Sequence, residues 1–401
     1  MRILILSPNW PFPADNGGKL RAASVASYLA QRHEVVFLCF TDTTESLARQ
    51  PEAMRFQEVQ GVSVPARGSR LRRWFSRTPA GLQNYSSPAM ARCVDTVIAR
   101  FSPEVLLVGD PLLTQYVVPY ADRVRILDYI CVETLQFERL QAISTGLSRI
   151  LWFLRRLKFA AYLRRITRYF DLCLVNSEED QTALLDVAST WRKIEFLPNG
   201  LDLSAYPLGL AAPQPKTMIF PGALTYTPNR DAITYFLRDV LPRIRTQVPD
   251  VTLSITGQVP TDGSAPQAPG VVYTGYVSDI RPMIAGAWVC PVPLRTGAGG
   301  ARFKVLEALA LGTPIVSTMI GAEGVHITDG VNMLMAEEPE EFAAQTVKIL
   351  QSPELRERLA AAGRQLIEQR YNWEVLGDRI AALAGELVDQ KQKKRRSTES
   401  G

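Results

Sequence analysis

Short apolar runs alternate with longer segments of helical periodicity along most of the chain. The short runs are rich in Val, Ile and Leu, as in the stretches from Ile3 to Leu6 and from Val35 to Phe40. The longer segments repeat their apolar residues with the 3.6-residue period of an amphipathic helix. Because the central strands of a parallel sheet are buried on both faces, this alternation predicts a doubly wound α/β fold.

The expected strands form two series, separated by a weakly periodic stretch that contains Pro207, Pro213 and Pro215. The first series comprises residues 2–7, 34–40, 105–109, 124–128, 172–176 and 193–197, and the second comprises 216–221, 251–256, 271–274, 287–293, 314–317 and 332–335. The expected helices include 19–31, 89–101, 229–246, 339–350 and 354–370.

A chain of 401 residues is long enough for two hydrophobic cores. We expect a Rossmann-like domain at 1–203, a linker at 204–215 and a second Rossmann-like domain at 216–372, with the carboxyl ends of the two sheets facing one another across a cleft. A helix at 373–390 is expected to cross back to the first domain. The basic tail at 391–401 has no apolar content, so we expect it to be disordered.

Composition adds little to this picture, because 46% hydrophobic and 21% charged residues are ordinary for a globular protein. A net charge of +5 is too small to imply nucleic acid as a partner. No apolar run reaches the roughly 18 residues of a membrane-spanning helix, and the first run lacks a cleavage pattern. The five widely spaced cysteines indicate buried thiols in a reducing compartment. We expect a cytoplasmic protein, either free or peripheral on the inner face of the cell membrane.

The stretch GAGGARFKVLEALALGTP, residues 297–314, places a glycine-rich turn before an amphipathic run. We expect a helix to begin near Ala301, where free N–H groups and the helix dipole attract an anion. Arg302 and Lys304 would stand in its first turn, where an uncompensated cation costs ~0.3–1 kcal/mol. A bound diphosphate would compensate both charges. Glu307, one turn further on, could accept hydrogen bonds from the vicinal hydroxyls of a ribose.

The same residues also allow a purely structural interpretation. Lys304 and Glu307 could form a surface pair worth ~0.2–0.5 kcal/mol, with the glycines serving only a tight turn. The residues alone favour neither interpretation.

An ordered series of segments resembles the GT-B glycosyltransferases of family 4, also called group 1. The series consists of residues 1–22, 174–185 (LVNSEEDQTALL), 197–202 (LPNGLD), 220–236 (FPGALTYTPNRDAITYF), 253–260, 271–287, 297–324 and 371–376 (YNWEVL). The resemblance implies a retaining transferase that moves a sugar from a nucleotide sugar, held mainly by the second domain, to an acceptor held mainly by the first. The overall sequence looks most like sugar transferases of bacterial exopolysaccharide systems.

The resemblance also implies roles for individual residues of the second domain. Glu307 matches the glutamate that binds the donor ribose, and Arg302 and Lys304 match basic positions that neutralise the diphosphate. In such enzymes the leaving diphosphate accepts the acceptor's proton, so the protein mainly stabilises growing negative charge. The expected catalytic residues are therefore Arg302 and Lys304. We expect no metal and no cofactor besides the nucleotide-sugar co-substrate.

Two further pairs are carried over in the same way. Gly17 and Gly18 match the glycine pair of the first strand–helix loop, which lets that loop approach the donor. Tyr276 and Val277 lie where family members often contact the base.

The chain departs from the family pattern at two places. Relatives often carry a glutamate eight positions before the ribose-binding one, and here that position is Gly299. The backbone amides of Gly299 or Gly300 would have to substitute, which puts sugar selectivity in doubt. Many relatives also have Gly-Arg and then Lys after the strand at 217–221, where this chain has Gly222 and Ala223. Arg302 and Lys304 would supply the positive charge that the Arg and Lys of these relatives place beside the phosphates.

Two features concern the acceptor. Asp128, at the end of a predicted strand, could orient an acceptor hydroxyl or serve as a cap or turn residue. Residues 148–169 hold seven basic side chains, no acid and interleaved apolar residues. This composition is typical of a segment that lies on an anionic membrane surface, and a lipid-linked or glycan acceptor would fit it. Alternatively, the apolar stripe packs on the first domain.

Two other functions stay open at this point. A hydrolysing nucleotide-sugar epimerase would need a pair of carboxylates for proton abstraction, and no convincing pair is evident in the sequence. A non-catalytic nucleotide-sugar-binding module would keep the fold without the chemistry, which the glycine at position 299 would suit.

Overall fold

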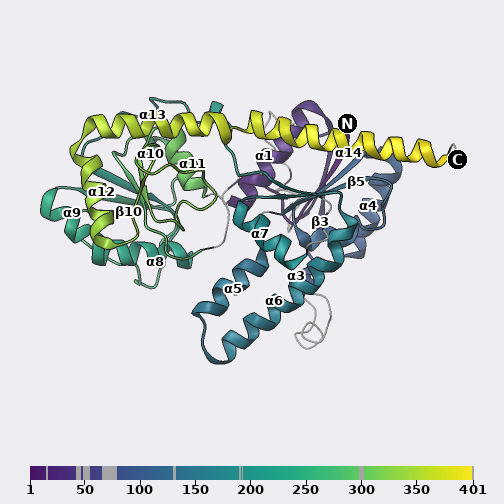
Figure 1. Cartoon of the computed structure of the whole chain (residues 1–401), viewed down its shortest axis with the longest axis horizontal. Coiled ribbons are helices and arrows are strands. Elements are labelled where there is room, and N and C mark those ends of the chain that lie inside the picture. Colours follow the sequence, from purple (N-terminus) through teal and green to yellow (C-terminus); the bar gives the residue numbers. More distant parts are fainter. Residues whose placement is uncertain are drawn as a thin grey trace. The chain divides into compact units, whose positions relative to one another are not determined.

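The structure is a computed structural model that describes residues 1–14, 17–41, 47, 55–65, 79–129, 132–188, 191, 193–297 and 302–399. The chain divides into two compact units. The first consists of Met1–Pro198 together with Leu376–Gly401, and the second of Asn199–Val375. Figure 1 shows the chain coloured along its sequence.

The first unit is built on a seven-stranded parallel sheet of order β3-β2-β1-β4-β5-β6-β7. Leu4 of the central strand pairs with Val36 on one side and Leu106 on the other, and all three are buried. The strand order reverses between β1 and β4, as in a doubly wound sheet. The strands are β1 (Arg2–Ser7), β2 (Glu34–Thr41), β3 (Glu58–Ser63), β4 (Val105–Val108), β5 (Val124–Tyr129), β6 (Leu172–Val175) and β7 (Ile194–Phe196).

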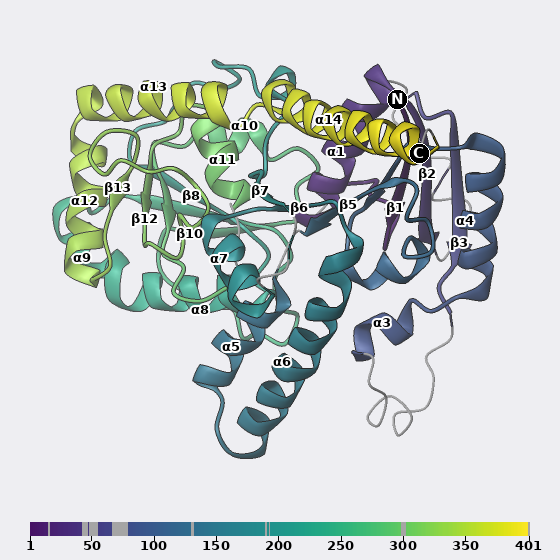
Figure 2. The ribbon, with the colours of Figure 1, turned by 45° about the vertical axis from the view of Figure 1, so that its right-hand side comes forward.

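Helices connect these strands, and two of them form a projecting hairpin. In Figures 1 and 2, α5 and α6 run side by side away from the sheet. The helices of the first unit are α1 (Gly17–Arg32), α3 (Ala80–Asn84), α4 (Pro88–Phe101), η2 (Pro111–Tyr116), α5 (Glu133–Ile143), α6 (Gly146–Ile166), η3 (Thr167–Tyr169), α7 (Glu178–Val187) and most of α14 (Trp373–Glu399).

The second unit repeats this topology on a smaller scale. Its two three-stranded parallel sheets have the orders β10-β9-β8 and β11-β12-β13. They are joined where Met218 of β8 forms a parallel bridge with Val289, next to β11. The order from β10 to β13 therefore contains the same reversal, and ligands bind outside the carboxyl ends of such strands. The strands are β8 (Thr217–Pro221), β9 (Thr252–Thr256), β10 (Val271–Gly275), β11 (Cys290–Val292), β12 (Ile315–Ser317) and β13 (Leu334–Met335).

Its helices enclose a single hydrophobic core that includes Phe220, Phe236, Leu306 and Phe342. They are η4 (Leu203–Ala205), α8 (Thr227–Tyr235), the π-helical segment η5 (Phe236–Val240), α9 (Leu241–Gln247), α10 (Arg281–Ala285), α11 (Phe303–Ala310), α12 (Pro339–Gln351) and α13 (Pro353–Arg370).

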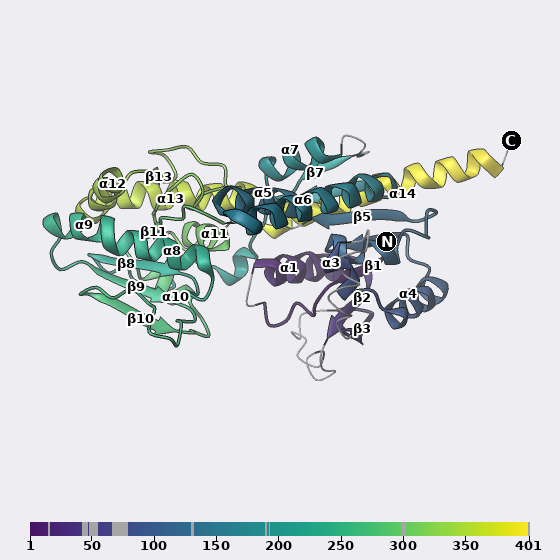
Figure 3. The same ribbon diagram turned by 90° about the horizontal axis from the view of Figure 1, so that it is seen from below.

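Strand β3 and the end of α14 differ from the sequence-based expectations. Strand β3 was not predicted, because it lies at the sheet edge with every residue at least partly exposed and so lacks a clear apolar pattern. The expected disorder of the tail at 391–401 is wrong for residues 391–399, which continue α14. Lys391 pairs with Asp171 and Arg395 with Asp122, both at 2.8 Å, so carboxylates compensate part of the basic run. The last turns of α14 project past the strands of the first unit (Figure 3).

Candidate functional site

Helix α11 starts where the strands of the second unit end, and it carries the two central candidate residues, Lys304 and Glu307. The helix begins at Phe303, so Arg302 is its N-cap residue and not a member of its first turn. This corrects the predicted start near Ala301. The N-terminus of α11 therefore lies at the sheet edge where doubly wound folds bind ligands.

Lys304 is held by uncharged neighbours from β8 and α8. Its Nζ donates to Asn229 Oδ1 at 2.8 Å and lies 4.1 Å from the centre of the Phe220 ring. Asn229 Nδ2 in turn donates to the carbonyl of Ala223 at 3.0 Å. At Gly222, with φ of 156°, a Cβ would come within 2.9 Å of Nζ and 2.6 Å of Asn229 Nδ2, so glycine is required here.

Burial makes the charged form of Lys304 costly. Desolvation lowers the pKa of Lys304 to about 7, and the nearby charge of Arg302 acts in the same direction. Cys290 and Glu307 oppose this shift in pKa. An anion placed beside Nζ would favour the charged form, because opposite charges stabilise one another.

Glu307 is oriented by a tyrosine from the segment before β8. Its Oε1 accepts a hydrogen bond of 2.8 Å from the Tyr206 hydroxyl. Burial raises the pKa of Glu307, while Tyr206, Arg281 and Lys304 counteract this rise. Burial also raises the pKa of Tyr206, so its hydroxyl keeps its proton and donates. Arg281 donates to the carbonyl of Ala205 at 2.6 Å beside this pair.

Arg302 already has a protein partner. Its Nη2 pairs with Glu323 Oε2 at 3.1 Å, and both side chains are largely buried. The predicted contact of Arg302 with a diphosphate would therefore have to share or replace this ion pair. Arg302 and Lys304 thus differ in surroundings, since Lys304 faces uncharged groups at its ammonium and Arg302 faces a carboxylate.

The other candidate residues belong to other elements. Tyr276 is exposed and Val277 partly buried, directly after β10, and Gly17 and Gly18 are exposed at the start of α1 in the first unit. Gly299 and Gly300 lie outside the described residues, so their predicted amide contacts stay predictions. Among the residues that the structure describes, no group of three or more His, Cys, Asp or Glu is placed to hold a metal.

Asp128 ends up inside the first unit, bound to an arginine. It is 2% exposed and Arg21 is 0% exposed. Arg21 Nε donates to both carboxylate oxygens at 2.9 and 3.0 Å, and Nη2 donates at 2.6 Å. Arg21 also donates to the carbonyl of Leu197 at 2.9 Å. This geometry gives Asp128 a structural partner, and its role toward an acceptor stays a prediction.

Sequence reasoning missed three residues that bond to the candidate side chains of Arg302, Lys304 and Glu307, namely Tyr206, Asn229 and Glu323. Tyr206 contacts Glu307 across 101 positions and Asn229 contacts Lys304 across 75, so no local pattern links them. Only the proline at 228, which marks the start of α8, could have drawn notice to Asn229 as a residue of a first helical turn.

Comparison with known proteins agrees with this architecture. Residues 215–352 match the family model of Glycosyl transferases group 1. A phosphatidyl-myo-inositol mannosyltransferase of Mycobacterium tuberculosis is 30% identical over 220 residues, which cover 49% of this chain and 57% of that protein. A GDP-mannose-dependent monoacylated alpha-(1-6)-phosphatidylinositol monomannoside mannosyltransferase of Corynebacterium glutamicum is 23% identical over 246 residues, covering 55% of this chain and 64% of that protein. The chain thus spans little more than half the length of the first relative.

Solved structures match over nearly the whole chain. Sucrose-phosphate synthase from Thermosynechococcus elongatus has a TM-score of 0.69 and 16% identity, covering 97% of this chain and 99% of that one. Anabaena Alr3699/HepE in complex with UDP-glucose has a TM-score of 0.67 and 15% identity, covering 96% and 100%. Two Rossmann-like units and these matches define a protein of the GT-B fold. The match of residues 215–352 to the group 1 glycosyltransferases agrees with the resemblance seen in the sequence.

Helices long and apolar enough to cross a membrane are absent from the described part of the chain.

Proposed function

We propose that the protein is a retaining glycosyltransferase that moves a sugar from a nucleoside diphosphate sugar to a glycan or lipid-linked acceptor. We place this reaction in polysaccharide or exopolysaccharide biosynthesis, on the cytoplasmic side of the cell membrane. The observation that carries the proposal is the placement of Lys304 and Glu307 at the start of α11, at the carboxyl edge of a doubly wound sheet. The names of relatives that include GDP-mannose and UDP-glucose support a donor of this class.

Each side chain has a distinct part in this reaction. Glu307, with Oε1 held by Tyr206, accepts hydrogen bonds from the ribose hydroxyls. Lys304 gains its full charge when the diphosphate docks beside it. As the bond between the anomeric carbon and the phosphate oxygen breaks, negative charge grows on that oxygen, and Lys304 stabilises it. The acceptor's proton passes to the leaving phosphate oxygen on the same face, so the configuration is retained without a metal.

Incubation with a panel of nucleoside diphosphate sugars tests this function. We expect a glycosylated product only when acceptor is present, with the donor's anomeric configuration and with no loss of rate in a chelator. A new free sugar formed without acceptor would instead identify an epimerase. Tight donor binding with no product across the acceptor panel would identify a binding module.

Substitution of Glu307 separates donor binding from chemistry. Glu307→Gln is expected to raise the donor KM at least about tenfold with a smaller change in kcat, because hydrogen bonds to a charged acceptor are worth ~1.5–3 kcal/mol. Steady-state kinetics at varied donor concentration measure this split. The exposed Glu354 on α13 provides the matched control, since Glu354→Gln should leave both constants unchanged. An unaltered KM in Glu307→Gln would remove the ribose contact from the proposal.

We also propose that the first unit binds an anionic membrane surface through α6. The second half of this helix packs into the core through Phe159, Tyr162 and Leu163. The first half of the helix does not pack into this core. The alternative in which the whole apolar stripe packs on the first domain therefore does not apply to the first half. Its exposed apolar residues follow the helical period and are Leu147, Ile150, Phe153, Leu154 and Leu157, which are 79, 55, 41, 47 and 50% exposed. Arg149, Arg155 and Lys158 on the same helix would meet lipid phosphates.

The variant with both Ile150→Ser and Leu154→Ser is expected to bind anionic vesicles at least about tenfold more weakly, because burial of one aliphatic side chain is worth ~1.5–3 kcal/mol. Co-sedimentation with vesicles rich in phosphatidylglycerol measures this. Leu208→Ser, at a leucine of the second unit that is 58% exposed, is the control and should bind like the parent. Equal binding by parent and double variant, or equal binding to neutral vesicles, would refute the membrane role of α6.

A further inference from the structure

Helix α8 supplies the group that fixes the direction of Lys304. Asn229 lies in the first turn of α8 and is only 7% exposed. Its amide is oriented at both ends, because Nδ2 donates to the carbonyl of Ala223 and Oδ1 accepts from Lys304 Nζ. Ala223 follows the last residues of β8, so the main chain at the sheet edge sets the direction of the amide, and the amide sets the direction of the ammonium group.

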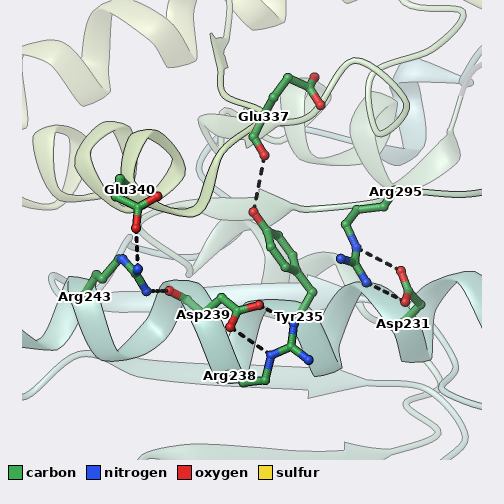
Figure 4. Close-up of polar contacts among 8 residues, drawn as sticks. All are labelled: Asp231, Tyr235, Arg238, Asp239, Arg243, Arg295, Glu337 and Glu340. Carbon is green, nitrogen blue, oxygen red and sulfur yellow. Dashed lines mark hydrogen bonds and ion pairs between the residues drawn. The ribbon is translucent and has the colours of Figure 1, made fainter.

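Helix α8 is itself held against two other segments of the second unit (Figure 4). Arg295, just after β11, binds both carboxylate oxygens of Asp231 at 3.1 and 2.7 Å. The Arg295 guanidinium lies 4.6 Å from the centre of the Tyr235 ring, and the Tyr235 hydroxyl donates to the carbonyl of Glu337 at 3.3 Å. These contacts fix α8 relative to β11 and to the segment before α12, and thereby fix Asn229.

We propose that Asn229 is a positioning residue of the donor site, which holds the Lys304 ammonium at the carboxyl end of β8 in the direction of a bound diphosphate. This inference rests on the proposed function and assigns a role to a residue that touches no reacting atom. A neutral amide suits the task, because it accepts a hydrogen bond from the ammonium without supplying a negative charge that would repel a phosphate.

The inference predicts opposite effects of two substitutions on the titration of Lys304. The titratable groups near Lys304 are Arg302 and Glu307 beside it on the chain and the Cys290 thiol on β11, and both variants keep all of them. Asn229→Ala removes an acceptor that favours the charged ammonium, so the pKa of Lys304 should fall further. Asn229→Asp places a carboxylate at the same point, so this pKa should rise.

Two measurements test the proposal in the full-length protein. The first is an NMR pH titration of lysine labelled with ¹³C at Cε, in which the Lys304 signal is identified by its loss in Lys304→Met. The second is calorimetric binding of UDP and GDP as probes, at about pH 6 to about pH 9. Both Asn229→Ala and Asn229→Asp should weaken diphosphate binding at least about tenfold near neutral pH, since the first misaligns the cation and the second repels the anion. Asp239→Asn, which alters only a surface ion pair with Arg238 on the same helical stretch, should match the parent.

The outcomes separate this inference from the function on which it rests. Opposite shifts of the Lys304 midpoint together with weaker binding in both variants support the positioning role. Unchanged midpoints and unchanged affinity in Asn229→Ala overturn it, even if the parent binds both probes. The third outcome combines opposite shifts of the Lys304 midpoint in the two variants with a parent that binds neither UDP nor GDP. It would support the Asn229–Lys304 link and overturn the proposed donor site.

Discussion

Lys304→Met is expected to slow sugar transfer by about 10²–10³-fold, the typical cost of removing one group that stabilises developing negative charge. Methionine is an unbranched apolar side chain that fills the buried position, but it loses the contact of Nζ with the Phe220 ring and has no charge to place beside the leaving diphosphate. Because the cation acts mainly as the phosphate bond breaks, kcat should fall more than donor affinity. Single-turnover rates with saturating donor measure the effect.

The same substitution is expected to raise stability at neutral and lower pH. The pKa of Lys304 lies at about 7 in the folded protein, below its usual 10.5, so between these values the unfolded chain holds a proton that the folded chain has released. Lys304 therefore costs most stability below about pH 7, and that cost is relieved as the pH rises toward about 10. Thermal unfolding of Lys304→Met should show a higher midpoint than the parent at about pH 6 and a smaller difference at about pH 9.

The exposed Lys348 on α12 is the matched control, because Lys348→Met removes a lysine without touching the site. It should change neither the transfer rate nor the pH dependence of unfolding. Full transfer activity in Lys304→Met would remove the catalytic role of this residue. A lower unfolding midpoint at about pH 6 would show that its buried charge is compensated in the free protein.

The sequence contains enough local information to predict the sheets and the location of α11. Strand β1 has the predicted bounds, because its apolar run is short, uninterrupted and followed by prolines. Lys304 and Glu307 were predicted together because both lie within one turn of the same helix, and residues three apart on a helix share a face. Their chemical environment was not predictable in this way, since burial, and with it the pKa of Lys304, depends on residues distant in sequence.

Long-range pairing also explains why the surroundings of two other candidates were not predictable. Arg302 was predicted to neutralise a diphosphate, and its ion pair with Glu323, 21 positions away on a separate segment, has no local signal in the sequence. Arg21 appears in the sequence as one basic residue of an amphipathic helix, which is normally exposed. Its burial follows only from Asp128, 107 positions further along, so neither residue alone indicated an ion pair.

Asp128→Ala is expected to lower the free energy of unfolding by about 3–5 kcal/mol, because it leaves the Arg21 guanidinium buried without its counter-ion. Urea denaturation of the whole chain, followed by tryptophan fluorescence, measures the change. A double variant with Arg21→Met and Asp128→Leu separates structure from function, since replacing a buried ion pair by apolar side chains often restores stability. If that double variant is stable and transfers sugar with an unchanged acceptor KM, Asp128 has only a structural role. A stable double variant with a strongly raised acceptor KM would instead support the acceptor contact predicted from the sequence, and parent-like stability in Asp128→Ala would refute the buried ion pair.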